Sequence, residues 1–545
     1  MSAFRRRIPI GPRSLIDRFQ TVLEALGTNI ENVYVIGGYE RRVTVKAQQV
    51  RAINLISAIG QLSRRTGGSA TVAVVGGGIA GCTTAVAAAC AGNSVVLLES
   101  GGRLMSPQTG SHRYLHPNLY DWPQNGWDRT SPQLPLMAWS AGDAGTVVRT
   151  LRKEFKSRQD TLGIEVVLDV ELVALEKNGE SVALAWGPGF NRRDFDFVVL
   201  CVGFGQEGSA TLSNPPYWHN DDLNQGRPVP TLVSGCGDGG LVDVLRVSIE
   251  DLRQEDIEEF LSLDDVKAAV EEIELGDSTP EQRSKAYLEL ASPRLDTVLA
   301  GRLRPKVPIY LNGTAPTPFE PPSSPVNRYL VSRLIRSRHV TYVRGRLPDD
   351  ARPDGGSLEL GAQTLTVTRV VRRHGPPKNP LAAFPNVIPN ITAEVARKLR
   401  VTSDVSRHPN WDDRAFARCT DVGRATSELV GSTGSRAKKS RVGWGKGRWT
   451  IVGGGRAHAA TLVVLGFEVV NVTNQSYVLR SSQGTRTLVV PRSPRVSDRV
   501  SRQIVQAAGV SRAAYVDAWK RKSTRHLPAE GQIVTGGVRQ PRKRS

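Results

Sequence analysis

Cysteine is scarce in this chain, and its few copies are widely spaced. The five cysteines among 545 residues are Cys82, Cys90, Cys201, Cys236 and Cys419, with no C-x-x-C pair. This spacing argues against a zinc ribbon, a disulfide scaffold and a dithiol redox motif, and it suits a reducing cytoplasm. We therefore expect a cytoplasmic protein with no metal site.

Long apolar runs are also missing. None reaches the ~18 residues that a membrane-spanning helix needs, and the basic start MSAFRRRIPIGPRS is not followed by the apolar stretch of a signal peptide. Apolar residues make up 39% and charged residues 23% of the chain, as in soluble globular proteins. We expect no membrane association, and a chain long enough for two to four domains, on the order of one per 150 residues.

Acidic residues are nearly absent from the last fifth of the chain. Residues 432–545 hold 22 Lys and Arg against 4 Asp and Glu, which leaves 50 and 48 of the chain's 72 basic and 52 acidic residues for 1–431. The body is therefore almost neutral, while the C-terminal part carries most of the net charge of +20. Such asymmetry predicts a segment that binds a polyanion.

The stretch VAVVGGGIAGCTTAVA (72–87) places a G-x-G-x-x-G pattern between an apolar strand and an alanine-rich helix. In this context Gly76 permits a tight turn, Gly78 leaves room for a pyrophosphate, and Gly81 lets helix and strand approach closely. The helix start supplies amides and a positive dipole end for phosphate. The alternative is a β-α-β unit that binds nothing. The predicted phosphate-binding residues are Gly76, Gly78, Ile79, Ala80 and Gly81.

The next strand, SVVLLE, ends in Glu99. A carboxylate at this position would accept hydrogen bonds from an adenosine ribose and would repel a 2′-phosphate. The first glycine turn is therefore predicted to bind a dinucleotide other than NADP.

A second glycine turn, GCGDGG (235–240), follows the strand PTLVS and opens the helix LVDVLRV. An acidic helical segment over 248–302 then separates it from the strand VPIYLNG, which offers Asn312 and Thr314 where a ribose-binding acid or an arginine is expected. This unit either binds NADH or NADPH, or serves as a scaffold whose helical insertion lines a substrate pocket. Its candidate cofactor-binding residues are Gly235, Gly237, Asp238 and Gly240.

A predicted β-meander over 163–187 and an apolar strand that reaches Gly203 complete a recognisable layout. Residues 69–375 resemble flavoproteins with two dinucleotide-binding domains, a group that includes flavin-containing monooxygenases and pyridine-nucleotide disulfide reductases. The resemblance implies FAD at the first turn, Gly203 in a second flavin-domain motif, and NAD(P)H at the second turn. The missing cysteine pair removes the disulfide-reductase branch.

The loop after the second strand is rich in polar and aromatic residues. ESGGR (99–103) is similar to the acid-then-GGR segment of flavin oxidases, with a shorter spacer, which implies that Arg103 lies near the cofactor. SHRYLHPNLYDWP (111–123) is similar to R-x-x-H-P-x-x-Y-D-W-P segments of bacterial flavoproteins; we expect Arg113 to reach the flavin phosphate. The alternative for each residue is a packed loop position. The candidates that would face the isoalloxazine ring are His116, Tyr120, Asp121 and Trp122.

The basic C-terminal part reads helix, three strands, helix over 449–523. It resembles the small HicA-type mRNA interferase fold, which is akin to double-stranded-RNA-binding domains. Ser476 or a neighbour and Ser493 stand where that family carries histidines, so RNA binding is expected rather than cleavage. A third glycine-turn unit, with His458 in place of its third glycine, and a basic surface that balances an acidic partner are the alternatives. The candidate nucleic-acid contacts are Lys438, Lys439, Arg441, Arg480, Arg486, Arg492 and Arg495.

The predicted fold class is α/β: two Rossmann-like dinucleotide-binding domains with a helical insertion, and a small basic α+β C-terminal domain. The predicted parts are an N-terminal α/β extension (1–66), an FAD-binding domain (67–228), a second Rossmann-like domain (229–375) with the insertion 248–302, a helical or loop return segment (376–431), a basic linker (432–448), the HicA-like domain (449–523) and a disordered tail (524–545).

The predicted function is that of an FAD-dependent oxidoreductase in which NAD(P)H or a small organic substrate reduces the flavin, with a C-terminal domain that binds RNA or another polyanion. One alternative is a nucleic-acid-binding, toxin-like, RNA-modifying or defence effector whose flavin domain senses redox state. A non-catalytic dinucleotide sensor is a third.

Overall fold

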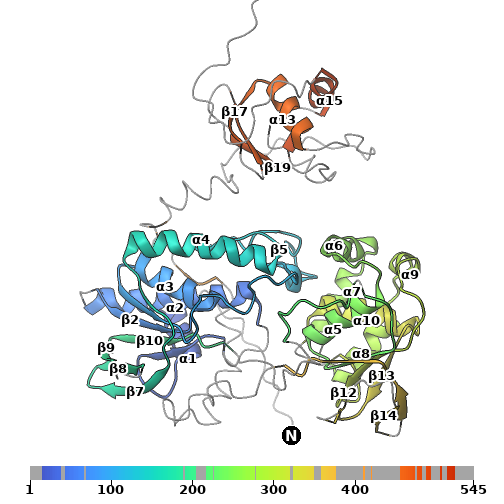
Figure 1. Ribbon diagram of the computed structural model, residues 1–545, viewed down its shortest axis with the longest axis horizontal. Helices are drawn as coiled ribbons and strands as arrows, with labels where there is room; N and C mark the ends of the chain where they lie inside the picture. Colours follow the sequence, from blue (N-terminus) through green and yellow to red (C-terminus); the bar gives the residue numbers. More distant parts are fainter. Residues whose placement is uncertain are drawn as a thin grey trace, which may run out of the picture. The chain divides into compact units, whose positions relative to one another are not determined.

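The chain is seen in a computed structural model (Figure 1). It divides into two compact units, Met1–Thr420 and Asp421–Ser545, and each is described by itself. The residues that the structure describes are 15–37, 43–66, 69–187, 191–203, 216–224, 226–276, 278–319, 323–348, 351, 357–361, 363–375, 409–411, 416, 419, 455–472, 476–481, 487–491, 504–505, 508 and 512–521.

A five-stranded sheet forms the first half of the first unit, and all its neighbouring strands pair in parallel. Its central strands are apolar throughout because both faces of a parallel sheet are covered. In the spatial order of the sheet, the strands are β1 (Val33–Val35), β10 (Phe197–Leu200), β2 (Thr71–Val75), β3 (Ser94–Leu98) and β6 (Glu165–Val167).

Helices cover one face of this sheet and a small antiparallel sheet covers the other (Figure 1). The alternation along β2 decides which side each residue meets: Val72 and Val74 pack among helical residues, whereas Ala73 and Val75 pack against the antiparallel sheet. The helices are α1 (Leu15–Leu26), α2 (Val45–Thr66), α3 (Ile79–Cys90) and α4 (Ala144–Leu162).

The predicted β-meander is present, but it begins and ends later than 163–187, because Glu165–Val167 forms strand β6 of the parallel sheet. It consists of β7 (Leu172–Asn178), β8 (Ser181–Trp186) and β9 (Asn191–Phe195), which pair antiparallel. The turn between the first two strands includes Gly179, whose φ of +57° favours glycine.

A four-stranded parallel sheet forms the second half of the unit and repeats the strand order of the first. In both sheets the strand before a glycine turn is flanked by the next strand on one side and by the last on the other, as in a Rossmann fold. The α/β class with parallel sheets is thus confirmed. The strands, in spatial order, are β13 (Val340–Arg344), β12 (Ile309–Gly313), β11 (Thr231–Ser234) and β16 (Arg369–Arg372).

The expected helical insertion is present between α5 (Asp238–Ser248) and β12. A further helix, α10 (Pro325–Arg336), follows β12, and a hairpin of β14 (Ser357–Leu360) and β15 (Gln363–Thr366) precedes β16. The insertion consists of α6 (Gln254–Leu263), α7 (Lys267–Leu275), α8 (Pro280–Glu289) and α9 (Pro293–Ala300).

The second unit contains the predicted order of helix, three strands and helix. Its described strands pair antiparallel, whereas a third dinucleotide-binding unit would need parallel strands. The side chain of His458 is buried, with its Nδ1 atom 2.8 Å from the hydroxyl of Tyr515. The elements bounded within the described residues are α13 (Gly455–Val464), β17 (Phe467–Val472), β18 (Ser476–Ser481), β19 (Thr487–Pro491) and α15 (Arg512–Arg521).

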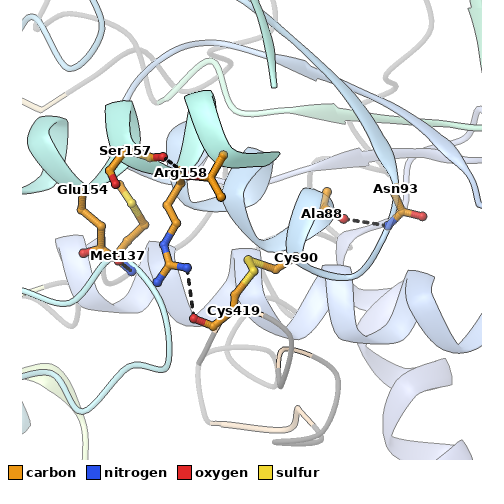
Figure 2. The surroundings of a disulfide bond; sticks show 9 residues. Ala88, Cys90, Asn93, Met137, Glu154, Ser157, Arg158 and Cys419 are labelled. Atoms are coloured by element: carbon orange, nitrogen blue, oxygen red, sulfur yellow. Dashed lines mark hydrogen bonds between the residues drawn. A yellow bond between two sulfur atoms is a disulfide. The ribbon is translucent and has the colours of Figure 1, made fainter. Parts of the chain in front are cut away.

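A disulfide joins Cys90, at the end of α3, to Cys419, 329 residues further along the chain (Figure 2). Arg158 of α4 points toward this bond and donates from Nη1 to the carbonyl of Cys419 at 3.0 Å. The pair corrects the expectation drawn from cysteine spacing, because tertiary structure brings together two residues whose separation gives no signal.

Among the helices that the structure describes, none is both long enough and apolar enough to span a bilayer.

Candidate functional site

The first glycine turn connects β2 to α3 and leaves open space beside Gly78, at the N-terminal end of the helix. We call this open space, and its counterpart beside Gly237 in the second turn, a ledge. Gly76 has a φ of +106°, and a Cβ atom there would lie 2.4 Å from the carbonyl oxygen of Cys201. A Cβ on Gly81 would lie 1.8 Å from the carbonyl oxygen of Gly76, so turn and helix touch. A Cβ on Gly78, by contrast, would meet no atom within 4 Å. The first amides of α3, including those of Ile79 and Ala80, therefore face open space at the positive end of the helix.

Glu99 stands beside this ledge, held by backbone amides. Its Oε2 accepts a hydrogen bond from Gly77 N at 2.5 Å and its Oε1 accepts one from Gly101 N at 2.8 Å. Each carboxylate oxygen can accept more than one hydrogen bond. The partly exposed carboxylate is thus oriented next to the turn, with remaining capacity for ribose hydroxyls.

The second glycine turn, between β11 and α5, repeats this geometry. Gly235 has a φ of +125°, and a Cβ atom there would lie 2.0 Å from the carbonyl oxygen of Arg373. A Cβ on Gly240 would lie 1.9 Å from the carbonyl oxygen of Gly235, and one on Gly237 would meet nothing within 4 Å. Each of the three glycines therefore plays the structural part of its counterpart in the first turn.

Both ledges open into one cavity of about 2630 Å³. Gly78 and Glu99 line it from the first half of the unit, and Gly237 lines it from the second. Gly203, with a φ of +70°, lies at its wall just beyond β10, and Gly375, with a φ of +76°, lies just beyond β16. The cavity lies where the carboxyl ends of the strands meet, the usual ligand position in open α/β sheets.

Asp238 lines the cavity, but its Oδ1 is bound to the start of α10. Ser324 N, Ser324 Oγ and Asn327 Nδ2 each donate to it at 2.7 Å. This carboxylate, predicted to bind cofactor, holds the N-terminal ends of α5 and α10 together.

Two of the loop residues predicted to face the flavin, His116 and Asp121, line the cavity but are bound by protein groups. The buried His116 accepts hydrogen bonds at Nδ1 from the amides of Asn118 and Leu119, at 3.2 and 2.9 Å. These bonds assign the proton of a neutral ring to Nε2. Asp121 forms an ion pair with Lys46 at 2.9 Å.

Tyr120 also lines the cavity, whereas Trp122 does not. Burial raises the pKa of Tyr120 well above its ordinary value, so the phenol keeps its proton. The indole of Trp122 is 1% exposed and stacks on Tyr329 at 5.3 Å between ring centres. This placement corrects the prediction for Trp122: the ring belongs to the core of the second Rossmann-like half, not to the flavin face.

The structure also differs from the predictions for two arginines. The guanidinium of Arg113 is buried against Asp243 and Asp221, at 2.9 and 3.1 Å, and it does not line the cavity. Arg103 is exposed and is likewise outside the cavity lining. The partners of Arg113 are therefore the carboxylates of Asp243 and Asp221, and not the flavin phosphate that the sequence predicts.

Sequence reasoning missed a contribution from the N-terminal extension. Residues 36–37 and 43–48 line the cavity, although they precede the first glycine turn. In the sequence these residues read as two short strands and the start of a helix, a pattern that says nothing about a ligand.

The sequence places Asn312 where a ribose-binding residue is expected, but it did not show that this residue forms a polar cluster at the ends of β11, β12 and β16. The Oγ of Ser234 donates to Asn312 Oδ1 at 2.6 Å and lies 2.8 Å from Nε2 of His374. All three residues line the cavity.

Residues 71–169, which include the first glycine turn and Glu99, match the protein family described as FAD-dependent oxidoreductases. The chain carries an FAD-dependent oxidoreductase domain. The open ledge at Gly78 and the anchored carboxylate of Glu99 fit the pyrophosphate and the adenosine ribose of FAD. No curated protein matches the sequence of this oxidoreductase.

Several solved structures are similar to parts of this chain. Bacillithiol disulfide reductase from Staphylococcus aureus is 10% identical, over 56% of this chain and 77% of its own, with a TM-score of 0.33. Thioredoxin reductase from Lactococcus lactis is 10% identical, over 66% of this chain and 100% of its own, with a TM-score of 0.32. OTEMO in complex with FAD and NADP is 12% identical, over 58% and 72%, with a TM-score of 0.30.

The candidate nucleic-acid residues fall mostly outside the described part of the oxidoreductase. Arg480 lies exposed on β18. The others, Lys438, Lys439, Arg441, Arg486, Arg492 and Arg495, lie outside the described residues.

Proposed function

We propose that this oxidoreductase binds NADH or NADPH at its second glycine turn and uses it to reduce FAD held at the first, for transfer to a small-molecule acceptor. The observation that carries the proposal is the repeated geometry of the two turns, which open into one cavity. The chemistry that bound FAD supplies is two-electron transfer between a nicotinamide and an acceptor.

The protein's own part is to bind and orient the two dinucleotides. The N-terminal ends of α3 and α5 each present unpaired amides and a positive dipole end to a pyrophosphate. Gly78 and Gly237 keep both ledges free of side chains. Tyr120, whose phenol stays protonated, lines the same cavity.

An anaerobic titration of the purified holoprotein tests this proposal. NADH or NADPH is expected to bleach the flavin absorbance of the wild type. Gly237→Val is expected to retain FAD and to lose this bleaching, because the backbone at Gly237, with a φ of −77°, accepts a side chain that would fill the second ledge.

Gly301→Val is the matched control, since Gly301 is exposed at the end of α9 and does not line the cavity. It should bleach like the wild type. Bleaching of the Gly237 variant at the wild-type rate would contradict the proposed site. Failure of both nucleotides to reduce the wild type would favour an oxidase that takes electrons from an organic substrate.

As a second function, we propose that the C-terminal unit binds RNA. The supporting observation is the balance of 22 basic against 4 acidic residues over 432–545, together with the exposed Arg480 on its sheet. Phosphate neutralisation by such residues releases counterions and makes binding depend on salt.

The test compares the full chain with a chain truncated before Ser432, using a fluorescent single-stranded RNA at several salt concentrations. The full chain should bind with an affinity that falls as salt rises, with a log–log slope of about −0.7 for each phosphate contacted. The truncated chain should retain FAD and lose binding. Equal binding by both chains would dismiss a role for this unit.

A further inference from the structure

The two halves of the cavity differ at the positions that contact an adenosine ribose, and this difference concerns the choice between NADH and NADPH. The inference rests on the proposed function, because it assumes that a nicotinamide dinucleotide binds at the second glycine turn.

The registers of the two sheets align these positions residue by residue. Gly76 N donates to Leu98 O at 2.8 Å, and Gly235 N donates to Asn312 O at 2.9 Å. Leu98 and Asn312 are therefore equivalent. The residue after each is the one whose side chain meets the ribose.

At that position the first half has Glu99 and the second has Gly313. The exchange is matched by a second one in the turn itself, where Gly77 of the first half corresponds to Cys236 of the second. A Cβ on Gly313 would lie 2.7 Å from the Sγ atom of Cys236, so the buried thiol occupies the space that the glutamate takes in the first half. The second site thus lacks the carboxylate that would repel a 2′-phosphate.

The next strand brings a positive charge to the same edge. Leu98 pairs with Val167 on β6, and Asn312 pairs with Val343 on β13. Three residues beyond each valine stand Val170 and Arg346, and both line the cavity.

The backbone at Arg346 is held close to Gly313, the residue that stands in place of Glu99. Gly345 N donates to the carbonyl of Gly313 at 3.0 Å, so the backbone next to Arg346 is fixed against Gly313. Arg344, at the end of β13, donates from Nε to the carbonyl of Thr314 at 3.2 Å and ties down the segment that follows Gly313.

We infer that the second site selects NADPH over NADH, because no carboxylate stands at Gly313 to repel the 2′-phosphate and Arg346 binds it. Compared with the first site, the second has Gly313 in place of Glu99 and Arg346 in place of Val170. Both differences favour binding of the 2′-phosphate. A guanidinium binds a phosphate through paired, charge-assisted hydrogen bonds, which an unphosphorylated ribose cannot form.

Equilibrium binding to the oxidised, FAD-loaded full chain tests the inference without turnover. Isothermal titration with NADP⁺ and NAD⁺ gives two dissociation constants for each variant. The wild type should bind NADP⁺ at least about tenfold more tightly than NAD⁺, the magnitude of one charge-assisted hydrogen bond. Arg346→Gln should weaken NADP⁺ about tenfold and leave NAD⁺ within about twofold.

Two further variants complete the design. Arg294→Gln removes an exposed arginine of α9 that does not line the cavity, and it should bind both nucleotides like the wild type. The double variant Cys236→Gly with Gly313→Glu transplants the arrangement of the first half, and it should reverse the preference toward NAD⁺. The FAD content of each variant, read from its absorbance, verifies that the protein is folded.

The results distinguish the selection of NADPH from the proposed binding of a nicotinamide dinucleotide at the second turn. Absence of binding by both nucleotides would overturn the proposed function itself. Equal affinities, or tighter binding of NAD⁺, would overturn only the selection of NADPH. An unchanged ratio in Arg346→Gln would remove that residue from the 2′-phosphate site.

Discussion

The guanidinium of Arg113 and the carboxylate of Asp243 form a buried, two-point ion pair, with distances of 2.9 and 3.2 Å. Arg113 lies in the loop that follows β3, and Asp243 lies on α5, behind the second glycine turn. Arg246 and Arg373 donate to the same carboxylate at 3.0 and 2.8 Å. The ring of Tyr217 lies 3.9 Å from the centre of the Arg113 guanidinium. This cluster fixes the orientation of the two halves that share the cavity.

Asp243→Asn should therefore destabilise the first unit strongly at neutral pH. Removing one partner of a buried ion pair costs about 3–5 kcal/mol, because it leaves buried charge uncompensated. Urea unfolding measures the loss. The control is Asp160→Asn, which breaks an exposed pair with Lys156 and should cost less than about 1 kcal/mol. Equal losses in the two variants would show that the buried cluster contributes no more than a surface pair.

The same cluster predicts a pH dependence. Burial alone would raise the pKa of Asp243, but the guanidinium of Arg113, with those of Arg373 and Arg246, lowers it to about 2, below the ordinary value of 3.8. A lowered pKa stabilises the folded state above the ordinary value, and this contribution disappears as the pH falls toward about 2. The difference in unfolding free energy between wild type and Asp243→Asn should thus be constant above about pH 5 and shrink below about pH 4. Shrinkage that begins above about pH 5 would mean that desolvation outweighs the arginines.

The glycines of the first turn predict opposite results for substitutions three residues apart. Gly78→Val should give a folded protein without FAD, because its backbone, with a φ of −70°, accepts a side chain that projects onto the ledge. Gly81→Val should fail to fold, because its Cβ would overlap the carbonyl oxygen of Gly76. Circular dichroism reports folding, and the ratio of flavin to protein absorbance reports FAD. A yellow Gly78 variant would contradict the assignment of the ledge to pyrophosphate.

The parallel sheets, the β-meander and the helical insertion could be predicted because each depends on local patterns. An apolar strand followed by spaced glycines and a helix has few other physical solutions, and the strand order then follows from the handedness of β-α-β connections. The open ledge at Gly78 is local in the same sense, since its glycines act on atoms of their own turn.

The misplaced side chains depend on partners far away in the sequence. The acidic partners of Arg113 lie more than a hundred residues further along the chain, so the sequence around Arg113 gives no sign of them and predicts a phosphate partner instead. Trp122 was assigned to the flavin, yet its stacking partner Tyr329 belongs to the second sheet's helices. Gly313 and Arg346 become meaningful only when the two registers are aligned, which needs the strand pairing.

The disulfide between Cys90 and Cys419 predicts how many cysteines react with a thiol reagent before and after reduction. Three buried cysteines, Cys82, Cys201 and Cys236, form no disulfide, and burial raises the pKa of Cys82 well above its ordinary value. In the native protein all three should react slowly with a thiol reagent, because the thiolate is the reactive species and the sulfur is covered.

After denaturation without reductant, the same reagent should label these three cysteines, and after reduction all five. Cys419→Ser should give four thiols under both conditions and should lower the stability of the first unit by about 2–5 kcal/mol, the usual effect of losing a disulfide. Five reactive thiols in the unreduced, denatured wild type would show that the pair is reduced in solution. In that case Arg158 and the packing around α3 would have to hold the segment at Cys419 in place without a covalent bond.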